Sequence, residues 1–357
     1  MSRPRRSARQ LAEMLRNPGG ILNDPQYRWE PACRRWLDHV DHSAHFDLPA
    51  ALRSAVLGVR LALRIDRDRK ATKGTNRCIV VRAYAVLGST HRAASQLDKA
   101  RRYLAKATDL ARRCASPDDV SDLYRRRAIL TANLAQRKDG SLDAVGLQNA
   151  SQLAEASVRC ACGSLVAVRG RNARGMILLY SGDWYSATRD AKWALGKLDP
   201  KEWPLDHVSV LSLLVNALAK GEESDRQEAA RYLDQLQAAL PPRCPAIRAR
   251  FLWAEGLLYF HNRQRKARAR KRLDQARRKF LASGRESEAV AVTADLVRHA
   301  PSGAVPRLCT DLLAILEPGP IRDLVQRLER TRLVERVDLA EELRSTIHGA
   351  LILPAVT

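Results

Sequence analysis

The sequence predicts an all-helical protein, an α-solenoid built from stacked helical hairpins. The composition is 45% apolar but only 5% aromatic, and few stretches alternate polar and apolar residues as strands do. Small and apolar residues also recur in pairs along most of the chain, as they do in repeat proteins. A lone hairpin cannot bury its own apolar face, so repeated hairpins are expected to stack on one another.

The clearest hairpin lies between Arg171 and Leu198, where two short amphipathic helices are separated by Ser181, Gly182 and Asp183. The first helix presents the small residue Gly175. The second carries alanines at spacings of four and three, which places them on one helix face: Ala187, Ala191 and Ala194. Small residues on facing stripes allow two antiparallel helices to approach closely, and Gly182 suits a tight link.

The same pairing recurs five times. The first-helix positions are Gly88, Ala128, Gly175, Ala217 and Leu257, and the matching second-helix alanines are Ala100, Ala144, Ala187, Ala229 and Ala269. The offset is 12 residues in every pair except the one from Ala128 to Ala144, where it is 16. Further repeat positions are Ala107, Ala194, Trp253 and Ala276. The unit near Asp118 fits the pattern least, because Gln148 stands where an apolar residue is expected.

The repeats are expected to fill residues 26–300, behind a basic arm at 1–25 that is partly disordered apart from a short helix at Ser7–Arg16. Two helices are predicted between Glu30 and Arg67, with a break near Phe46–Pro49 and Asp47 as an N-cap. Residues 301–357 are expected to cap the solenoid with three helices, at Val305–Leu316, Ile321–Leu328 and Val334–Leu351.

These residues resemble the tetratricopeptide repeat. The resemblance rests on Gly182-Asp183-Trp184 before the alanine stripe, on Tyr84 and Gly88 before Ala100, and on Trp253 and Phe260 before Ala269. It implies a right-handed superhelix of antiparallel helical hairpins. The units recur at about 42 residues, whereas the family unit has about 34, so longer turns are expected between hairpins.

From about residue 35 the chain is also similar to a group of bacterial repeat proteins of largely unassigned role. The shared feature is a hairpin followed by F-x-x-x-G, here Phe280–Gly284, and a further helix at Glu288–His299. Some members of that group look like the sensor or effector halves of regulators. The resemblance therefore implies a regulator that senses a peptide or a ligand.

The chain is strongly basic, with 62 Lys and Arg against 39 Asp and Glu and a net charge of +23. Such a charge suggests a polyanionic partner, although solvated helix surfaces rich in Arg would give the same composition. Seven cysteines, an odd number, do not form a disulfide pattern. The longest apolar run, Val208–Ala219, is shorter than the about 20 residues that cross a bilayer. We therefore expect a soluble, cytoplasmic protein with no membrane partner.

The stretch from 263 to 279 is the main candidate for a binding site, because ten of its seventeen residues are Lys or Arg and one, Asp274, is acidic. Its packing stripe is predicted to be Ala269, Leu273, Ala276 and Phe280, which leaves the positive charges on the solvent-facing arc. The candidate residues are Arg263, Arg265, Lys266, Arg268, Arg270, Lys271, Arg272, Arg277, Arg278 and Lys279. They would bind nucleic acid or an acidic protein surface, or serve only as a solvated face.

Several smaller motifs favour ordinary structural roles. The clusters Arg101-Arg102, Arg112-Arg113 and Arg125–Arg127 are predicted to be solvated faces that would extend the basic field. His39, His42 and His45 lie near Asp41, but steps of three residues spread the outer pair by about 120° around a helix, so no metal site is expected. Cys160 and Cys162 are predicted to pack within the protein.

No enzyme signature is present in the sequence. Gly170 and Gly175 have the spacing of a phosphate loop, but Met176 stands where Lys is needed. Gly-x-Ser-x-Gly and His-Glu-x-x-His are absent. The sequence therefore predicts a non-catalytic adaptor without a cofactor, which binds another protein within a larger complex or regulatory system. The alternatives are nucleic-acid binding through 263–279 and a peptide- or ligand-sensing regulator.

Overall fold

The computed structural model describes residues 30–44, 46–70, 78–94, 96–112, 116–135, 143–241, 244–260 and 265–282, with Leu22 and ten isolated positions between 289 and 326. These ranges contain twelve helices and no strand. The helices are α2 (Glu30–Ser43), α3 (Leu48–Lys70), α4 (Cys78–Ala93), α5 (Leu97–Ala111), α6 (Pro117–Leu134), α7 (Ala144–Cys160), α8 (Ser164–Tyr180), α9 (Trp184–Leu195), α10 (Pro204–Leu218), α11 (Glu223–Ala239), α12 (Pro245–Phe260) and α13 (Lys266–Ala282).

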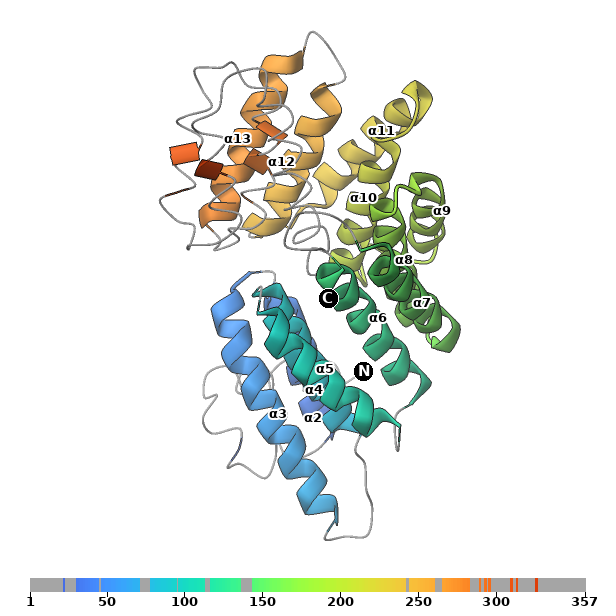
Figure 1. Ribbon diagram of the computed structural model, residues 1–357, viewed down its shortest axis with the longest axis vertical. Helices are drawn as coiled ribbons and strands as arrows, with labels where there is room; N and C mark the ends of the chain where they lie inside the picture. Colours follow the sequence, from blue (N-terminus) through green and yellow to red (C-terminus); the bar gives the residue numbers. More distant parts are fainter. Residues whose placement is uncertain are drawn as a thin grey trace.

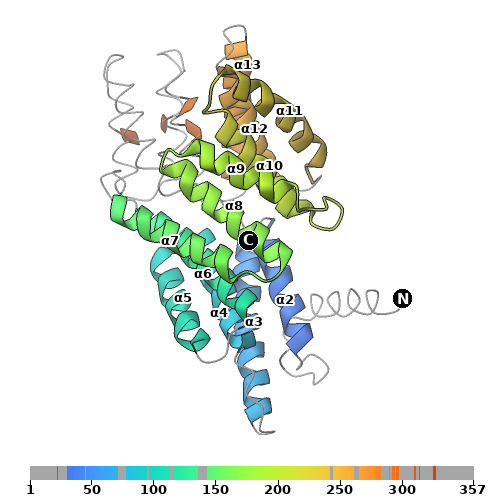
Figure 2. The same cartoon turned by 90° about the vertical axis from the view of Figure 1, so that its right-hand side faces the viewer.

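The helices pack in neighbouring pairs that follow one another along the molecule (Figures 1 and 2). Each helix contacts the next one in the chain, and each even-numbered helix from α2 to α10 also contacts the next even-numbered helix. The even-numbered helices therefore form a continuous row. The all-helical fold of sequentially paired helices that the sequence predicts is confirmed.

Alanines hold the pairs together where the repeat pattern places them. Ala100, Ala187, Ala229 and Ala269 are fully buried. The backbones approach so closely that a methyl group added at Gly88 would lie 3.3 Å from the Ala100 carbonyl oxygen. Small residues at these positions are therefore a steric requirement, as predicted.

Two positions of the predicted repeat register are wrong. In α12 the residue of closest approach is Gly256 rather than Leu257, because a methyl group on Gly256 would lie 3.3 Å from the Ala269 carbonyl oxygen. In α7, Ala144 is exposed because the helix begins there, after an N-cap at which Asp143 accepts a hydrogen bond from the Val145 amide. The stripe that α7 buries is Leu147, Ala150, Ala154 and Ser157.

Two apolar cores meet at α6. Leu123 and Leu130 belong to the core formed with α2 to α5, whereas Ala128, Ile129 and Ala132 belong to the core that extends to α13. This division follows from helical geometry, because neighbouring positions along the chain face different sides of the helix. α6 therefore joins the two ends of the described structure.

The helix boundaries follow local sequence signals. Asp47 accepts a hydrogen bond from the Ala50 amide at 2.9 Å, so the predicted N-cap and the break between α2 and α3 are confirmed. Gly182 has a φ of 83°, a conformation that suits glycine, in the turn between α8 and α9. Asp183 then caps α9 by accepting from the Ser186 amide at 2.9 Å.

Other predictions lie outside the described residues. They are the basic arm at 1–25 apart from Leu22, the helix at Glu288–His299 apart from isolated positions, and the caps at 301–357 apart from isolated positions. Within the part of the chain that is described, no helix combines the length and the apolar character needed to span a bilayer.

Candidate binding surfaces

The basic helix α13 packs on α12 through the stripe that the sequence predicts. Ala269, Leu273, Ala276 and Phe280 are all fully buried, and the Phe280 ring meets the Trp253 ring edge-on at 6.2 Å between centroids. The stripe is therefore confirmed, and the remaining positions of α13 determine which charges reach solvent.

Two of the predicted binding residues on α13 are tied into the protein. Arg277 is only 4% exposed and forms an ion pair with Asp274 at 3.0 Å, so its place on the solvent-facing arc is wrong. It follows Ala276 and lies one turn after Leu273, at the edge of the packed face. Arg272 is half-buried and pairs at 2.8 Å with Glu255 of α12, which is 3% exposed.

Arg268 and Arg265 are exposed and lie over the ring of Tyr259 on α12. Their guanidinium carbons are 4.9 and 5.3 Å from the ring centroid. Arg268 also approaches Glu255 at 3.6 Å. Contacts of this kind hold the two side chains near the α12 surface while leaving their charges accessible.

Three basic residues of α13, namely Lys266, Arg270 and Lys271, form no ion pair with any described residue. Lys266 and Lys271 are exposed and Arg270 is half-buried. Arg278 is also exposed, although it pairs with Asp274 at 2.8 Å, and Lys279 is half-buried. Arg263 lies outside the described residues. We call Arg265, Lys266, Arg268, Arg270, Lys271 and Arg278 the α13 basic surface.

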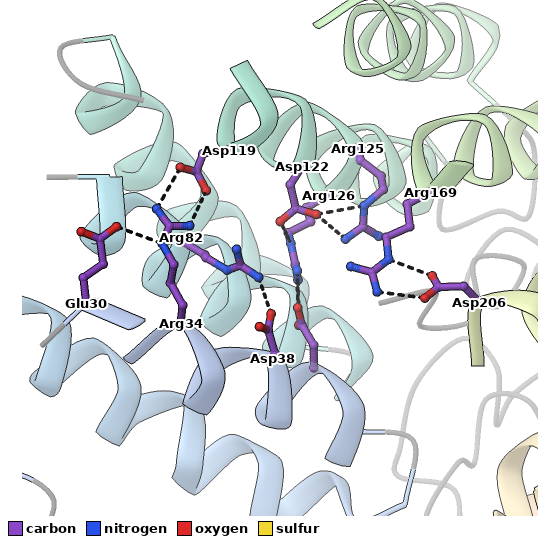
Figure 3. A network of polar contacts seen from close by, with 11 residues as sticks. Glu30, Arg34, Asp38, Arg82, Asp119, Asp122, Arg125, Arg126, Arg169 and Asp206 are labelled. Carbon is purple, nitrogen blue, oxygen red and sulfur yellow. Dashed lines mark hydrogen bonds and ion pairs between the residues drawn. The ribbon is translucent and has the colours of Figure 1, made fainter. Parts of the chain in front are cut away.

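A second concentration of arginines lies inside the row of even-numbered helices (Figure 3). Arg125 and Arg126 of α6 are 1% and 2% exposed, so the prediction that they form a solvated face is wrong. Asp122 binds both of them, with 2.6 Å to Arg125 Nη2 and 2.7 Å to Arg126 Nε. Arg126 also donates to Asp41 of α2, at 3.0 Å from Nη1 to Oδ1.

This network extends along the row in both directions. Arg34 of α2 binds Glu30 at 2.9 Å and both carboxylate oxygens of Asp119 at 3.3 and 3.4 Å. Arg82 of α4 pairs with Asp38 of α2. Further along, Arg169 of α8 donates two hydrogen bonds to Asp206 of α10, at 2.8 and 2.9 Å. Charge pairs thus link α2 with α4 and α6, and α8 with α10. We call these eleven residues the inner-row network.

Helical spacing explains why the charges meet. Arg34, Asp38 and Asp41 are four and three residues apart on α2, and Asp119, Asp122 and Arg126 have the complementary spacing on α6. The pairs Arg34–Asp119 and Asp41–Arg126 are both 85 residues apart. These equal separations show that α2 and α6 run in the same direction. Complementary charge spacing on two distant helices was the signal that could have revealed the network.

Neighbouring arginines keep Asp122, the central acid of the network, ionised. Burial alone would raise the pKa of Asp122, but the guanidinium groups of Arg126 and Arg125 hold it well below its ordinary value. Six carboxylates (Glu30, Asp38, Asp41, Asp119, Asp122 and Asp206) face five guanidinium groups (Arg34, Arg82, Arg125, Arg126 and Arg169). Because these charges nearly cancel, the inner-row network joins helices and offers little charge to a polyanion.

The remaining candidate groups have local roles. Trp36 lies 6.2 Å from the ring of His39, and Phe46 stacks on His42 at 5.0 Å, while His45 lies outside the described residues. The described residues contain no group of three potential metal ligands. Cys162 is exposed rather than packed, so that prediction is wrong; its amide donates to Asp118 at 2.9 Å.

Arg101, Arg102 and Arg112 are exposed, which confirms the predicted solvated face on α5, and Arg113 lies outside the described residues. No protein-family model matches the sequence, and no curated protein matches it either. What supports a function is therefore the arrangement of the helices and the charge on their surfaces.

Proposed function

We propose that this protein is a non-catalytic helical-repeat scaffold that binds another protein within a larger complex or regulatory system. The observation that carries the proposal is the continuous row of even-numbered helices, in which charge pairs join α2 to α4 and α6, and α8 to α10. Because each hairpin in such a stack contacts only its neighbours, every helix pair presents surface to a partner.

A right-handed superhelix of the tetratricopeptide-repeat type is part of this proposal. Its support is the regular direction of the even-numbered helices: Arg169–Asp206 and Asn172–Ser209 are both 37 residues apart and join α8 to α10 in parallel. First helices of successive hairpins run parallel in such solenoids. A cytoplasmic setting also belongs to the proposal and rests on the seven cysteines of the sequence, six of which are described and form no disulfide with one another.

The direct test is an affinity purification of the tagged full chain at physiological salt, after nuclease treatment. We expect one protein to be recovered at a fixed ratio to the chain, as judged by mass spectrometry and by native mass. The proposal fails if nucleic acid is the main companion before nuclease treatment and no protein remains afterwards.

Nucleic-acid binding through the α13 basic surface is a second candidate. The observation in its favour is that Lys266, Arg270 and Lys271 form no ion pair with any described acid. A phosphate backbone would relieve the repulsion between them and release counterions.

Reversal of Lys266, Arg270 and Lys271 to Glu tests this second candidate. If all three contact phosphates of duplex DNA, the slope of log K against log salt should shrink by about 2.7, since each contact contributes about 0.9. The matched control reverses Lys99, Arg101 and Arg102 of α5, which are all exposed and change the net charge by the same amount. An equal loss in both variants would mean that the total charge, rather than α13, attracts the DNA.

A peptide- or ligand-sensing regulator stays a prediction from the resemblance. Thermal stabilisation of the folded chain by a peptide or a small molecule would support it, because a ligand stabilises the state that it binds.

A further inference from the structure

The exposed face of α3 carries a regular line of side chains. Its members alternate in spacing between three and four residues: Arg53, Val56, Arg60, Leu63 and Arg67. At about 100° per residue they fall within an arc of about 80° on one side of the helix. All five are exposed, and Val56 and Leu63 are 39% and 40% exposed. We call this line the α3 stripe.

The α3 stripe has an aliphatic edge and a basic edge. Val56 and Leu63 lie on the side of the half-buried Leu52, while Arg53, Arg60 and Arg67 lie on the other side. The opposite face of the helix is packed against the protein through Ala55, Ala62 and Ile65, which are 1% exposed or less. The stripe is therefore a second amphipathic pattern, separate from the one that folds α3 onto its neighbours.

The three arginines of the stripe form no ion pair with the described acids, in contrast with those of the inner-row network. α3 contacts α2 and α4, and it is longer than both, with 23 residues against 14 and 16 (Figure 1). From Arg53 to Arg67 the stripe extends for about 21 Å, enough for a partner helix of four turns.

We propose that the α3 stripe docks an acidic amphipathic helix of a partner protein; this inference rests on the scaffold function proposed above. Alternating steps of three and four residues are the pattern with which one helix packs along another. Aliphatic side chains of the partner would pack against Val56 and Leu63. Its Asp or Glu residues would face Arg53, Arg60 and Arg67 and set the register and the direction of docking.

Charge and shape distinguish this occupant from others. A nucleic acid would use the arginines but gain nothing from Val56 and Leu63. A second copy of this chain would add its own net charge of +23, and the repulsion would oppose association. The other exposed large apolar side chains among the described residues, Phe46, Leu134, Val145 and Tyr185, do not lie on α3.

The probe is a synthetic helical peptide of 21 residues with leucines at alternating steps of three and four and glutamates beside them. Its control is a peptide of the same composition in which the order is scrambled. We measure binding to the full chain by fluorescence anisotropy at physiological salt. The patterned peptide should bind at least about tenfold more tightly than the scrambled one, because only it can fill the aliphatic edge.

Two variants of the chain separate the two edges. Leu63→Asp should weaken binding of the patterned peptide by at least about tenfold, and Arg60→Glu by a similar factor with a strong salt dependence. Val145→Asp is the matched control, since it adds the same charge at a more exposed apolar position, and it should change nothing. Unchanged circular dichroism verifies that each variant folds.

Three results would overturn the inference. The scrambled peptide would bind equally well if charge alone were recognised. If the chain binds a single-stranded RNA, and Arg60→Glu abolishes that binding but Leu63→Asp does not, the stripe is a nucleic-acid surface. The third result uses a peptide of the chain's own residues 334–351, which carry Glu335, Asp338, Glu341 and Glu342. If this peptide binds more tightly than the patterned one, the stripe serves this chain rather than a partner.

The failure of this inference can be told apart from the failure of the scaffold function. If the affinity purification recovers a defined protein that still binds the Leu63→Asp variant, the scaffold function stands and the α3 stripe is not its docking site. If no protein is recovered with the unaltered chain, the scaffold function itself falls.

Discussion

The arginines of the inner-row network and those of α13 are equally conspicuous in the sequence, yet they lie in opposite surroundings. Arg125 and Arg126 are 1% and 2% exposed and share Asp122, whereas Lys266, Arg270 and Lys271 form no ion pair with a described acid. The same residue type thus joins helices in one region and remains available to a partner in the other.

The difference arises from where the acids stand. Asp41 of α2 accepts a hydrogen bond from Arg126 of α6, 85 residues away, because the fold brings the two helices within reach of an arginine side chain. Most of α13 has no such neighbour, and its one acid, Asp274, pairs with Arg277 and Arg278. A cluster of arginines is therefore a binding surface only when the facing helices fail to neutralise it.

The largest effect should come from removing the acid at the centre of the inner-row network. Asp122→Ala leaves two buried arginines without their shared partner, and we expect a loss of about 3–5 kcal/mol in the free energy of unfolding. Urea denaturation followed by circular dichroism measures it. Asp41→Asn leaves Asp122 in place and should lower the free energy of unfolding by less. It can be measured even if Asp122→Ala does not fold.

The control for this comparison is an exposed ion pair. Asp98 and Arg101 of α5 approach at 3.4 Å with side chains 80% and 68% exposed, so Asp98→Ala should change stability by less than about 0.5 kcal/mol. Equal losses for Asp98→Ala and Asp122→Ala would mean that burial in the network contributes nothing.

A smaller loss of stability is expected at Glu255 of α12, a buried acid that faces arginines of α13. Glu255 is 3% exposed and faces Arg272 at 2.8 Å and Arg268 at 3.6 Å, but these partners are 30% and 55% exposed. Solvent reaches the arginines, so Glu255→Gln should cost about 1–2 kcal/mol, less than Asp122→Ala. The same urea titration tests this order.

Glu255→Gln should also raise the affinity of α13 for polyanions. With the carboxylate gone, Arg268 and Arg272 carry positive charge that no longer has a buried partner. Affinity for a heparin column should rise, and elution should need more salt than for the unaltered chain. Earlier elution of the Glu255→Gln variant would contradict the assignment of Glu255 as the partner of these arginines.

Much of the fold follows from local sequence, because packing between hairpins depends on residue size at short spacing. Gly88 with Ala100 and Gly175 with Ala187 predict the close approach of their helices, and the structure confirms both. The register of α7 was missed because Ala144 has the right size at a place where the helix only begins. Size alone does not locate a helix start.

The candidate surfaces are less accessible to sequence analysis. The stripe of Ala269, Leu273 and Ala276 correctly predicts which face of α13 is buried. It does not predict that Arg277, at the edge of that face, is buried with it. The inner-row network was missed because its pairs join helices 37 to 85 residues apart, and a single sequence contains no record of which helices are neighbours.

Acid should weaken the inner row through Asp122. Its pKa is lowered in the folded state, so the unfolded chain takes up the proton first, near pH 3.9. Its contribution is complete above about pH 5 and decreases by up to about 1.4 kcal/mol per pH unit as the pH falls toward the folded-state pKa. The stability difference between the unaltered chain and Asp122→Asn should therefore shrink below about pH 4.

The histidines allow this acid effect to be isolated. Burial lowers the pKa of both His39 and His42, and this effect is common to the unaltered chain and Asp122→Asn. Their contribution cancels in the difference between the two proteins. A difference that stays constant from pH 6 to about pH 3 would mean that Asp122 is not held ionised by its arginines.

The smallest effect on stability should come from the α13 basic surface. Reversal of Lys266, Arg270 and Lys271 to Glu removes no ion pair with a described residue and relieves repulsion among like charges on one helix. We expect a change within about 0.5 kcal/mol, of either sign, in the same urea titration. A loss of several kcal/mol would show that these side chains belong to the folded core of charge pairs, and the distinction between the two arginine-rich regions would disappear. A neutral result together with a reduced salt slope for DNA would instead show that α13 keeps its charge for a partner, at no cost to the fold.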